Sequence, residues 1–382
     1  MNAKEWKEKL YLHKKNGGLV LSEEELQKAQ DFCQEYKNFL NCSKTEREAV
    51  HYAVARAEAQ GFVPFDPNTA YKAGDKVYLN NRGKALILAV VGKNCLCDGV
   101  HILAAHTDSP RLDLKQVPVY EDGEMAYFKT HYYGGIKKYQ WVTTPLSLHG
   151  VLVKNDGTTV TVRVGEDEGD PVFCVTDLLP HLAADQMKRP AAELIRGEEL
   201  NLVVGSLPFR DDEASERVKL NLLKILFEKY GVTEADFLSA ELEVVPAFKA
   251  GDVGFDRSFV GGYGQDDRVC AFTEMEAVFD CGVPDTTVMC IFADKEEIGS
   301  CGSTGMKCAF LRHFIEDLAA AHGIEGRTVL KNSKCLSADV SAAFDPTFAD
   351  VYERKNNAFV NYGVSICKYT GSRGKGGASD AS

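Results

Sequence analysis

Short apolar runs alternate with helical patterns in both outer parts of this chain. The runs at residues 85–91, 100–105 and 287–293 have the length and the aliphatic content of buried strands. Residues 269–279 and 303–318 instead have the spacing of helices that bury one face. Alternation of this kind predicts an α/β layer architecture with a mainly parallel sheet.

Local motifs predict where some elements begin and end. Ser22 precedes Glu25 by three residues and Ser43 precedes Glu46 by three, which predicts two helices that open with capping boxes. Residues 76–79 are separated from the run at 85–91 by the turn sequence Asn-Asn-Arg-Gly. This pattern predicts a β-hairpin.

The middle of the chain has a different texture, with Gly-Gly pairs and short alternating strands at 151–153 and 160–164. One longer helical pattern lies at 213–230. We therefore expect one α/β domain built from two separated pieces and interrupted by a β-rich insertion. The predicted boundaries are 1–115 for the first piece, 116–247 for the insertion and 248–382 for the second piece.

Charge and apolar content exclude several classes of protein. The 382 residues carry 44 basic and 56 acidic side chains, a net charge of −12, which argues against nucleic acid or an anionic membrane as a partner. No apolar stretch approaches the roughly 18 residues that span a bilayer, and the first residues lack the apolar core of a signal peptide. We expect a cytoplasmic protein whose twelve scattered cysteines are reduced.

Polar residues follow the predicted strands at the places where ligands collect in α/β sheets. Taken singly, each has a structural explanation: a histidine hydrogen-bonded in the core, a solvated pair of glutamates, or an aspartate that caps a helix. Their joint placement at strand ends favours a functional site. The residues selected on this basis are His106, Asp108, Asp266, Glu296, Glu297 and Asp339.

One imidazole and several carboxylates suit a divalent ion such as Zn, Mn or Co. Two metals close together need a bridging carboxylate and activate water for attack on a carbonyl. Of two adjacent glutamates, one can bind metal while the other acts as general base. Asp108, two residues after His106, can hold the second imidazole nitrogen.

Four motifs in order carry a family resemblance: AAHTDSP, GQDDR, DKEEIGSCGSTG and SADVS. Together they resemble the co-catalytic zinc aminopeptidases, most closely the aspartyl aminopeptidase and aminopeptidase I family. The likeness includes GGIKKYQWVTTPLSLHG in the insertion and the terminal GASDAS. It implies a three-layer helix-sheet-helix zinc-peptidase-like catalytic domain with an inserted β-rich domain. The activity implied is a metal-dependent aminopeptidase acting on peptides with a free N-terminus.

The resemblance also implies a role for each matching residue. Asp266 would bridge two divalent metals, most simply zinc, with Glu297 on the first metal and His106 and Asp339 on the second. Glu296 would be the general base toward a metal-bound hydroxide. The remaining implied features are supporting contacts to the metal site from Asp108 and His181, and a cis peptide bond after Asp266.

His181 matches a family histidine that reaches into the active site of a neighbouring subunit. The resemblance therefore implies a homo-oligomer, in the family a tetrahedral dodecamer, with the insertion forming dimer contacts.

Two departures from the family pattern keep alternatives open. Trp141 is followed by Val-Thr-Thr-Pro rather than the Asp-Arg pair of aspartyl aminopeptidases, so a preference for acidic N-terminal residues is not implied. Lys368, Arg373 and Lys375 are either cations near the site or a solvated basic loop. The family takes a further histidine ligand from a C-terminal segment, which we expect beyond Ser382. The alternative is an inactive binding or assembly protein on the same fold.

Overall fold

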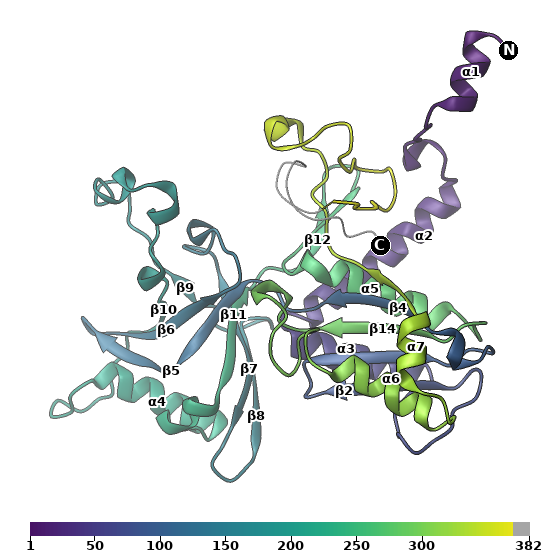
Figure 1. Ribbon diagram of the computed structural model, residues 1–382. Coiled ribbons are helices and arrows are strands. Elements are labelled where there is room, and N and C mark those ends of the chain that lie inside the picture. Colours follow the sequence, from purple (N-terminus) through teal and green to yellow (C-terminus); the bar gives the residue numbers. More distant parts are fainter. Residues whose placement is uncertain (370–382) are drawn as a thin grey trace. The chain divides into compact units, whose positions relative to one another are not determined.

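The computed structural model describes residues 1–369 (Figure 1). The described part of the chain divides into two compact units, one formed by residues 1–35 with 340–369 and the other by residues 36–339. The predicted site residues all belong to the second unit. The last part of the chain, with Arg373, Lys375 and the GASDAS terminus, lies outside the described residues.

Within the described residues, six strands of the second unit form a mixed sheet. Three neighbouring pairs, β1–β2, β14–β4 and β4–β15, are parallel, and the pairs β2–β3 and β3–β14 are antiparallel. The predicted hairpin and the three predicted buried strands are confirmed. The order across the sheet is β1 (Val63–Pro64), β2 (Lys76–Asn81), β3 (Ala85–Val90), β14 (Val288–Ala293), β4 (His101–His106) and β15 (Lys334–Ser337).

Helices cover both faces of this sheet (Figure 1). Successive residues of a strand point to opposite faces, so Leu86 and Leu88 pack with one helical layer and Ile87 and Ala89 with the other. These layers confirm the helix-sheet-helix architecture. The first layer holds α2 (Glu23–Cys42, through residues 36–42), α3 (Glu46–Ala59) and α5 (Gln265–Asp280), and the second holds α6 (Phe310–Ala320) and α7 (Gly326–Asn332).

A second sheet of seven strands, all paired antiparallel, is built from the segment between β4 and α5. Its core includes Leu112, Leu148 and Val244, and Leu222 of α4 (Arg217–Tyr230) packs against it. The order is β8 (Thr159–Val164), β7 (Leu146–Val153), β11 (Glu241–Pro246), β5 (Arg111–Asp122), β6 (Met125–Tyr133), β10 (Leu202–Gly205) and β9 (Cys174–Val175). A separate hairpin joins β12 (Gly251–Val253) to β13 (Phe259–Gly261).

Charged side chains are buried where the two sheets meet. The guanidinium of Arg111 on β5 lies 3.3 Å from Glu243 of β11 and 3.5 Å from Glu46 of α3. Glu46 also pairs with Lys84, next to β3, at 2.8 Å. All four side chains are at least nine-tenths buried. The seven-stranded sheet is thus tied to the helical layer by ion pairs shielded from solvent.

Two helix starts differ from the sequence prediction. Thr45 rather than Ser43 caps α3, and its capping box closes with Glu48. The predicted helix over 303–318 begins only at Phe310. Residues before it form a loop because the Thr304 hydroxyl donates to the carboxylate of Asp294, at 2.5 Å, outside the sheet.

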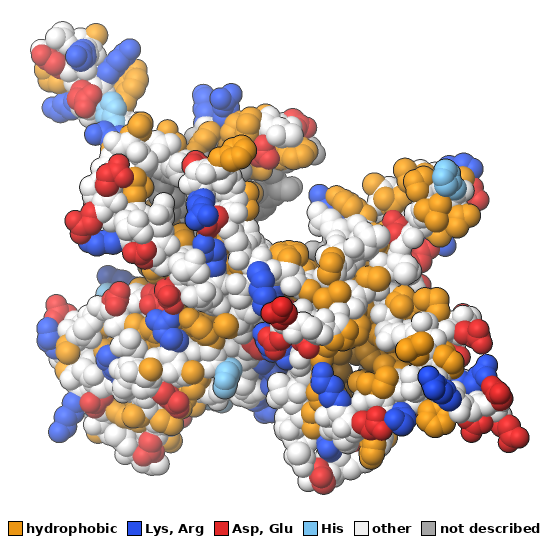
Figure 2. All heavy atoms as spheres, turned by 180° about the vertical axis from the view of Figure 1, so that it is seen from behind, with side chains coloured by type: hydrophobic (Ala, Val, Ile, Leu, Met, Phe, Trp, Pro, Cys, Tyr) orange, Lys and Arg blue, Asp and Glu red, His pale blue; other side chains and the backbone are white. Residues whose placement is uncertain are grey.

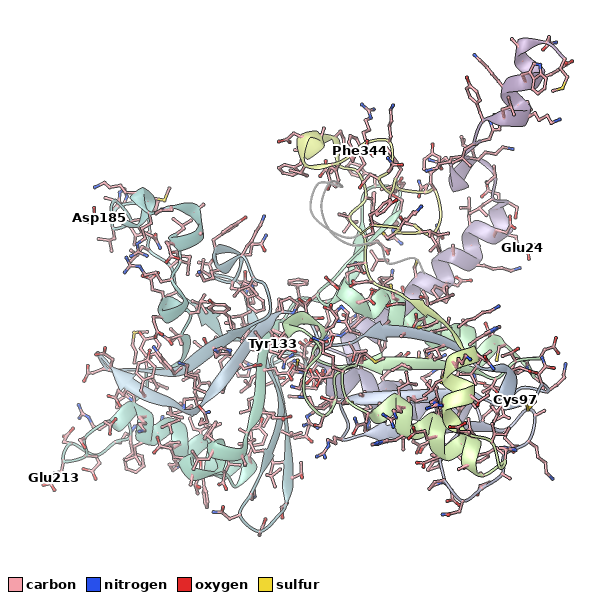
Figure 3. All side chains as sticks on the ribbon, viewed as in Figure 1. Glu24, Cys97, Tyr133, Asp185, Glu213 and Phe344 are labelled. Atoms are coloured by element: carbon pink, nitrogen blue, oxygen red, sulfur yellow. A yellow bond between two sulfur atoms is a disulfide. The ribbon has the colours of Figure 1, made fainter. Side chains whose placement is uncertain are left out.

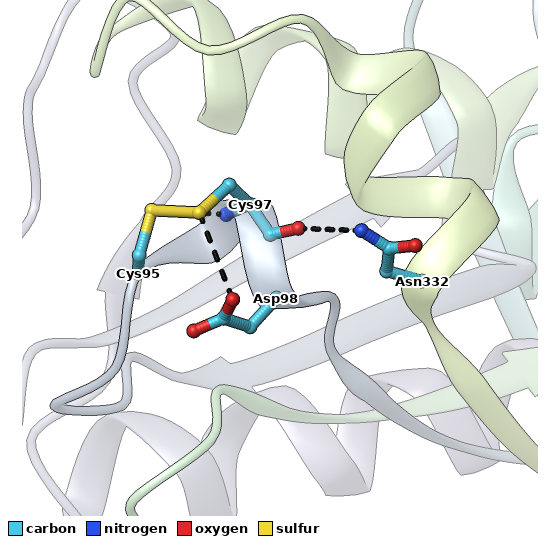
Figure 4. The surroundings of a disulfide bond; sticks show 4 residues. All are labelled: Cys95, Cys97, Asp98 and Asn332. Atoms are coloured by element: carbon cyan, nitrogen blue, oxygen red, sulfur yellow. Dashed lines mark hydrogen bonds between the residues drawn. A yellow bond between two sulfur atoms is a disulfide. The ribbon is translucent and has the colours of Figure 1, made fainter.

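The expectation that all cysteines are reduced is wrong at one place. Cys95 and Cys97 form a disulfide in the loop before β4, where their Cα atoms lie 5.2 Å apart (Figure 4). Asn332 at the end of α7 donates to the Cys97 carbonyl oxygen at 2.8 Å, which connects this loop to the second helical layer. Cys290, inside β14, is buried and unbridged, as predicted for a cysteine in an apolar run.

The first unit combines α1 (Ala3–Leu10), the start of α2 and the described part of the C-terminal segment. The capping box predicted at Ser22 is present, because Ser22 and Glu25 exchange hydrogen bonds between side chain and backbone. Gly17 donates to the carbonyl oxygen of Asn361 at 2.7 Å. Within residues 1–369, every helix is too short or too polar to cross a membrane.

Candidate metal centre

The site forms at one edge of the six-stranded sheet. His106 is the last residue of β4, and the neighbouring strands β14 and β15 run parallel to β4. The segments that follow these three strands therefore leave the sheet at the same edge. Glu296 and Glu297 lie on the turn after β14, and Asp339 lies just beyond β15. Sheet topology thus brings together donors that are far apart in the sequence.

Two groups of three donors could each hold a metal ion. His106, Asp266 and Glu297 each offer an atom within 4.8 Å of the others, and so do His106, Glu296 and Asp339. The Nε2 atom of His106 lies 3.0 Å from Asp266 Oδ1 and 3.8 Å from Glu296 Oε2. His106 is buried, whereas about half of the Asp266 and Glu296 side-chain surfaces is exposed. The donors therefore line an open side of the sheet edge.

The electrostatics of the centre favour a cation. Burial by itself lowers the pKa of His106, but hydrogen bonds to Asp108 and Asp266 outweigh it and raise the pKa to about 11. Burial and the negative charge of Asp266 raise the pKa of Glu297 to about 7. Burial also raises the pKa of Glu296. Without a metal the group holds excess negative charge and retains protons, and a divalent ion would replace them.

Asp108 holds the metal donors in place through hydrogen bonds. Its carboxylate is fully buried and accepts hydrogen bonds from the backbone N–H groups of Glu296, at 3.1 Å, and Glu297, at 3.2 Å. Asp108 Oδ1 also lies 3.3 Å from His106 Nδ1, whose closest acceptor is the Asp108 carbonyl oxygen at 2.9 Å. One aspartate therefore fixes both the imidazole and the glutamate turn.

The start of α5 presents Asp266 to the centre. Asp266 and Asp267 have non-helical backbone angles, so the regular part of α5 begins only after this pair. The peptide bond between Asp266 and Asp267 is cis, as the family resemblance implied. Ser109 donates its hydroxyl hydrogen to the Asp266 carbonyl oxygen at 2.8 Å. Arg268, almost fully buried, fastens the helix to the segment after β4 by donating to the Thr107 carbonyl oxygen at 3.1 Å.

His181 is not one of these metal donors. It belongs to neither group of three, and its side chain is exposed in the loop between β9 and β10. Hydrophobic side chains around it are exposed as well: 48% of the surface of Leu178, 67% of Leu182 and 70% of Met187. Figure 2 shows hydrophobic side chains gathered over the part of the chain that holds the seven-stranded sheet.

Tyr133 and Arg111 also support the metal centre, although no local sequence motif identifies them as part of the site. Tyr133, at the end of β6, donates its hydroxyl hydrogen to Asp108 Oδ2 at 2.7 Å. The guanidinium carbon of Arg111 lies 3.9 Å from the centroid of the Tyr133 ring. The only local signal in the sequence is the Gly-Gly pair after Tyr133, which indicates a turn but does not predict the contact of Tyr133 with Asp108.

The donor set fits divalent metal ions. One imidazole and four carboxylates are ligands that Zn, Mn and Co accept, and the hydrogen bonds that raise the pKa of His106 show that the centre favours a positive charge. A layered α/β sheet that gathers such donors beyond its strand ends, with a glutamate available as base, is typical of a metal-dependent hydrolase.

Comparison with known proteins gives the family. The sequence model of the family described as "Aminopeptidase I zinc metalloprotease (M18)" matches residues 39–382. A "Probable M18 family aminopeptidase 1" from Clostridium acetobutylicum is 52% identical over 354 residues, which are 91% of this chain and 76% of that protein. Another of the same description, from Thermotoga maritima, is 45% identical over 92% of this chain and 78% of its own length.

Solved structures agree with this result. The crystal structure of an M18 family aminopeptidase from Thermotoga maritima superposes with a TM-score of 0.89 at 43% identity, covering 96% of this chain and 80% of that one. Aminopeptidase I from Clostridium acetobutylicum gives 0.89 at 46% identity, covering 98% and 82%. The chain belongs to the M18 family of zinc metalloproteases and is a zinc metalloaminopeptidase. The resemblance seen in its four motifs is confirmed.

Proposed function

We propose that this chain removes residues from the free N-terminus of peptides with two divalent ions, most simply zinc, held by His106, Asp266, Glu297 and Asp339. The observation that carries the proposal is that His106 belongs to two donor groups at once, each with its atoms within 4.8 Å of one another. Asp266 and Glu297 would hold one ion with His106 close by, and Asp339 would join His106 at the other. Mn and Co suit the same donors.

When bound, such ions lower the pKa of water and polarise a peptide carbonyl. The residue that we assign as general base is Glu296. Its carboxylate is half exposed toward the open side, and its backbone N–H is fixed by Asp108. Because burial raises its pKa, Glu296 takes a proton from the attacking water and can return it to the leaving amine.

Glu296 is itself one of the five donors, so the assignment needs an experiment that separates a base from a ligand. Hydrolysis of a panel of aminoacyl-anilides is measured with and without chelator, together with zinc content. We expect chelator to abolish turnover. We expect Glu296→Gln to lose at least about 100-fold in kcat while it keeps its zinc, because only proton transfer is removed.

The matched control is Glu228→Gln, an exposed position on α4, which should behave as the unmodified chain does. Turnover that is insensitive to chelator, or full activity of Glu296→Gln, would contradict the proposed function. Loss of zinc in Glu296→Gln would show that Glu296 is a metal ligand rather than the general base. The anilide panel also reports whether acidic N-terminal residues are preferred.

We further propose that the chain is a cytoplasmic homo-oligomer in which His181 reaches the active site of a second copy. The exposed position of His181 among exposed leucines supports this, because hydrophobic patches on loops are typical of protein interfaces. A dodecamer structure of mApe1 from S. cerevesiae, 24% identical to this chain, has the same fold. In this proposal residues 116–247 form the contact domain, inserted between catalytic segments 1–115 and 248–382.

A further inference from the structure

Tyr133 connects the seven-stranded sheet to the metal donors. It ends β6, lies between the two sheets in Figure 3, and is only 7% exposed. Its hydroxyl donates to Asp108 Oδ2 at 2.7 Å, the shortest hydrogen bond that the Asp108 carboxylate receives. Burial and the neighbouring Asp108 charge raise the pKa of Tyr133, so the hydroxyl keeps its hydrogen and acts as a donor.

The tyrosine ring is held in place from the other side. Arg111 is its partner in the register of β5 and β6, and the guanidinium carbon lies 3.9 Å from the ring centroid. Arg111 is itself fixed by Asp113, at 2.8 Å, and by buried Glu46 and Glu243. A cation over a ring face inside a buried network leaves the ring little freedom. The Tyr133 hydroxyl is therefore held in one position beside the Asp108 carboxylate.

The Asp108 carboxylate links the Tyr133 hydroxyl to the metal donors. Oδ1 faces His106 Nδ1 and the N–H of Glu296, while Oδ2 faces the N–H of Glu297 and the hydroxyl of Tyr133. Burial alone would raise the pKa of Asp108, but hydrogen bonds from His106 and Tyr133 outweigh it and lower the pKa. Loss of the tyrosine hydroxyl would leave Oδ2 with one donor and free the carboxylate to turn.

We propose that Tyr133 is a positioning residue of the aminopeptidase: through Asp108 it sets the orientation of the His106 imidazole and of the Glu296–Glu297 turn. This inference rests on the proposed function, because those residues are its metal donors and its base. It makes the end of β6, and with it the seven-stranded sheet, part of the support of the metal centre. Outer partners of this kind change metal affinity by about 10 to 100-fold when they are removed.

Tyr133→Phe tests the proposal, since it removes one hydroxyl and keeps the ring over Arg111. The full chain is titrated with Zn²⁺ against a competing chelator, and the visible absorption of the Co²⁺-loaded protein is recorded. We expect zinc affinity to fall by about 10 to 100-fold, the Co²⁺ spectrum to change, and kcat to fall while KM stays within about twofold. The control is Tyr127→Phe on the same strand, whose hydroxyl contacts the Met125 sulfur.

A double variant shows whether Tyr133 acts through Asp108. Added to Asp108→Asn, Tyr133→Phe should change zinc affinity by less than about twofold, because the carboxylate that it orients is already gone. Fully additive losses would overturn the inference. So would Tyr133→Phe with the zinc affinity and Co²⁺ spectrum of the unmodified chain, or a Tyr133→Phe chain that fails to fold while Tyr127→Phe folds.

The outcome for the unmodified chain separates this inference from the proposed function. If that chain neither binds Zn²⁺ nor cleaves the anilides, the proposed function fails and the inference fails with it. If the unmodified chain does both and Tyr133→Phe equals it, only the inference is overturned.

Discussion

The Nζ atom of Lys84 lies 2.8 Å from Oε1 of Glu46, and both side chains are buried between the six-stranded sheet and α3. Burial by itself raises the pKa of Glu46, but the charges of Arg111 and Lys84 outweigh it and lower the pKa far below its usual range. Glu46 is thus the ionised centre of the buried network that joins the two sheets.

This relationship predicts a large loss of stability in Glu46→Gln. Two buried cations would lose their shared carboxylate, and breaking a buried pair from one side costs about 3–5 kcal/mol. Urea denaturation at constant pH measures the free energy of unfolding. The exposed pair of Lys224 and Glu228 provides the control, and Glu228→Gln should change stability by less than about 1 kcal/mol. Equal effects of the two substitutions would show that burial does not matter here.

Zinc binding should release protons. At pH 7 the His106 imidazole, with a pKa raised to about 11, is protonated, and Glu297, with a pKa of about 7, is about half protonated. A metal must displace these protons, so we expect between about one and two protons released and weaker zinc binding as pH falls. Calorimetric titration in two buffers of different ionisation enthalpy measures the number. A pH-independent affinity would contradict the charge balance described for the centre.

Stability should decrease as pH rises above the ordinary histidine range, because of His149. Burial lowers the pKa of His149, but hydrogen bonds to Glu166, at 3.2 Å, and Glu48, at 2.8 Å, raise it above 6.5 in the folded chain. A raised pKa in the folded state gives stabilisation that is complete below 6.5 and is lost as pH rises through the folded-state pKa. His149→Gln should flatten this dependence in urea unfolding between about pH 6 and 9. The exposed His322→Gln serves as control.

Gly134→Ala should impair catalysis beyond its effect on stability. Gly134 has φ +71°, and an added Cβ would lie 3.3 Å from the Cβ of Glu297. Gly123 has φ +57° with open space around it, so Gly123→Ala carries a similar backbone strain of about 1–2 kcal/mol without that contact. We expect kcat to fall by about tenfold or more only in Gly134→Ala. Equal kcat values would show that Glu297 tolerates the displacement.

His181 should act in trans if the proposed oligomer is correct. His181→Ala and Glu296→Gln would each be inactive alone. Mixed assemblies would regain part of the activity, because some sites would pair an intact Glu296 with an intact His181. Chains of both variants are mixed, dissociated, reassembled and assayed, with molar mass determined by light scattering. A monomeric chain, or no recovery in mixed oligomers, would contradict the trans role.

Local sequence patterns determined much of the framework. The run at 85–91 is apolar at every position, so the side chains on both faces of β3 are buried, as expected for a strand that is covered on both sides. The hairpin at 76–91 and the cap at Ser22 follow from turn and capping chemistry, which depends on neighbours in sequence. Polar residues after apolar strands located His106, Glu296 and Asp339, because parallel neighbours end at the same sheet edge.

Tertiary structure decided what depends on partners distant in the sequence. The loop before α6 contains such a contact, because the Thr304 hydroxyl donates to the carboxylate of Asp294, ten residues earlier in the chain. Nothing near Tyr133 in the sequence indicates that its hydroxyl meets Asp108, because that contact exists only once β6 is paired and the two sheets have come together. The sequence alone thus determined which groups provide the chemistry. The packing of the two sheets decided how those groups are held, since the orientation of a buried carboxylate depends on all of its hydrogen-bond donors together.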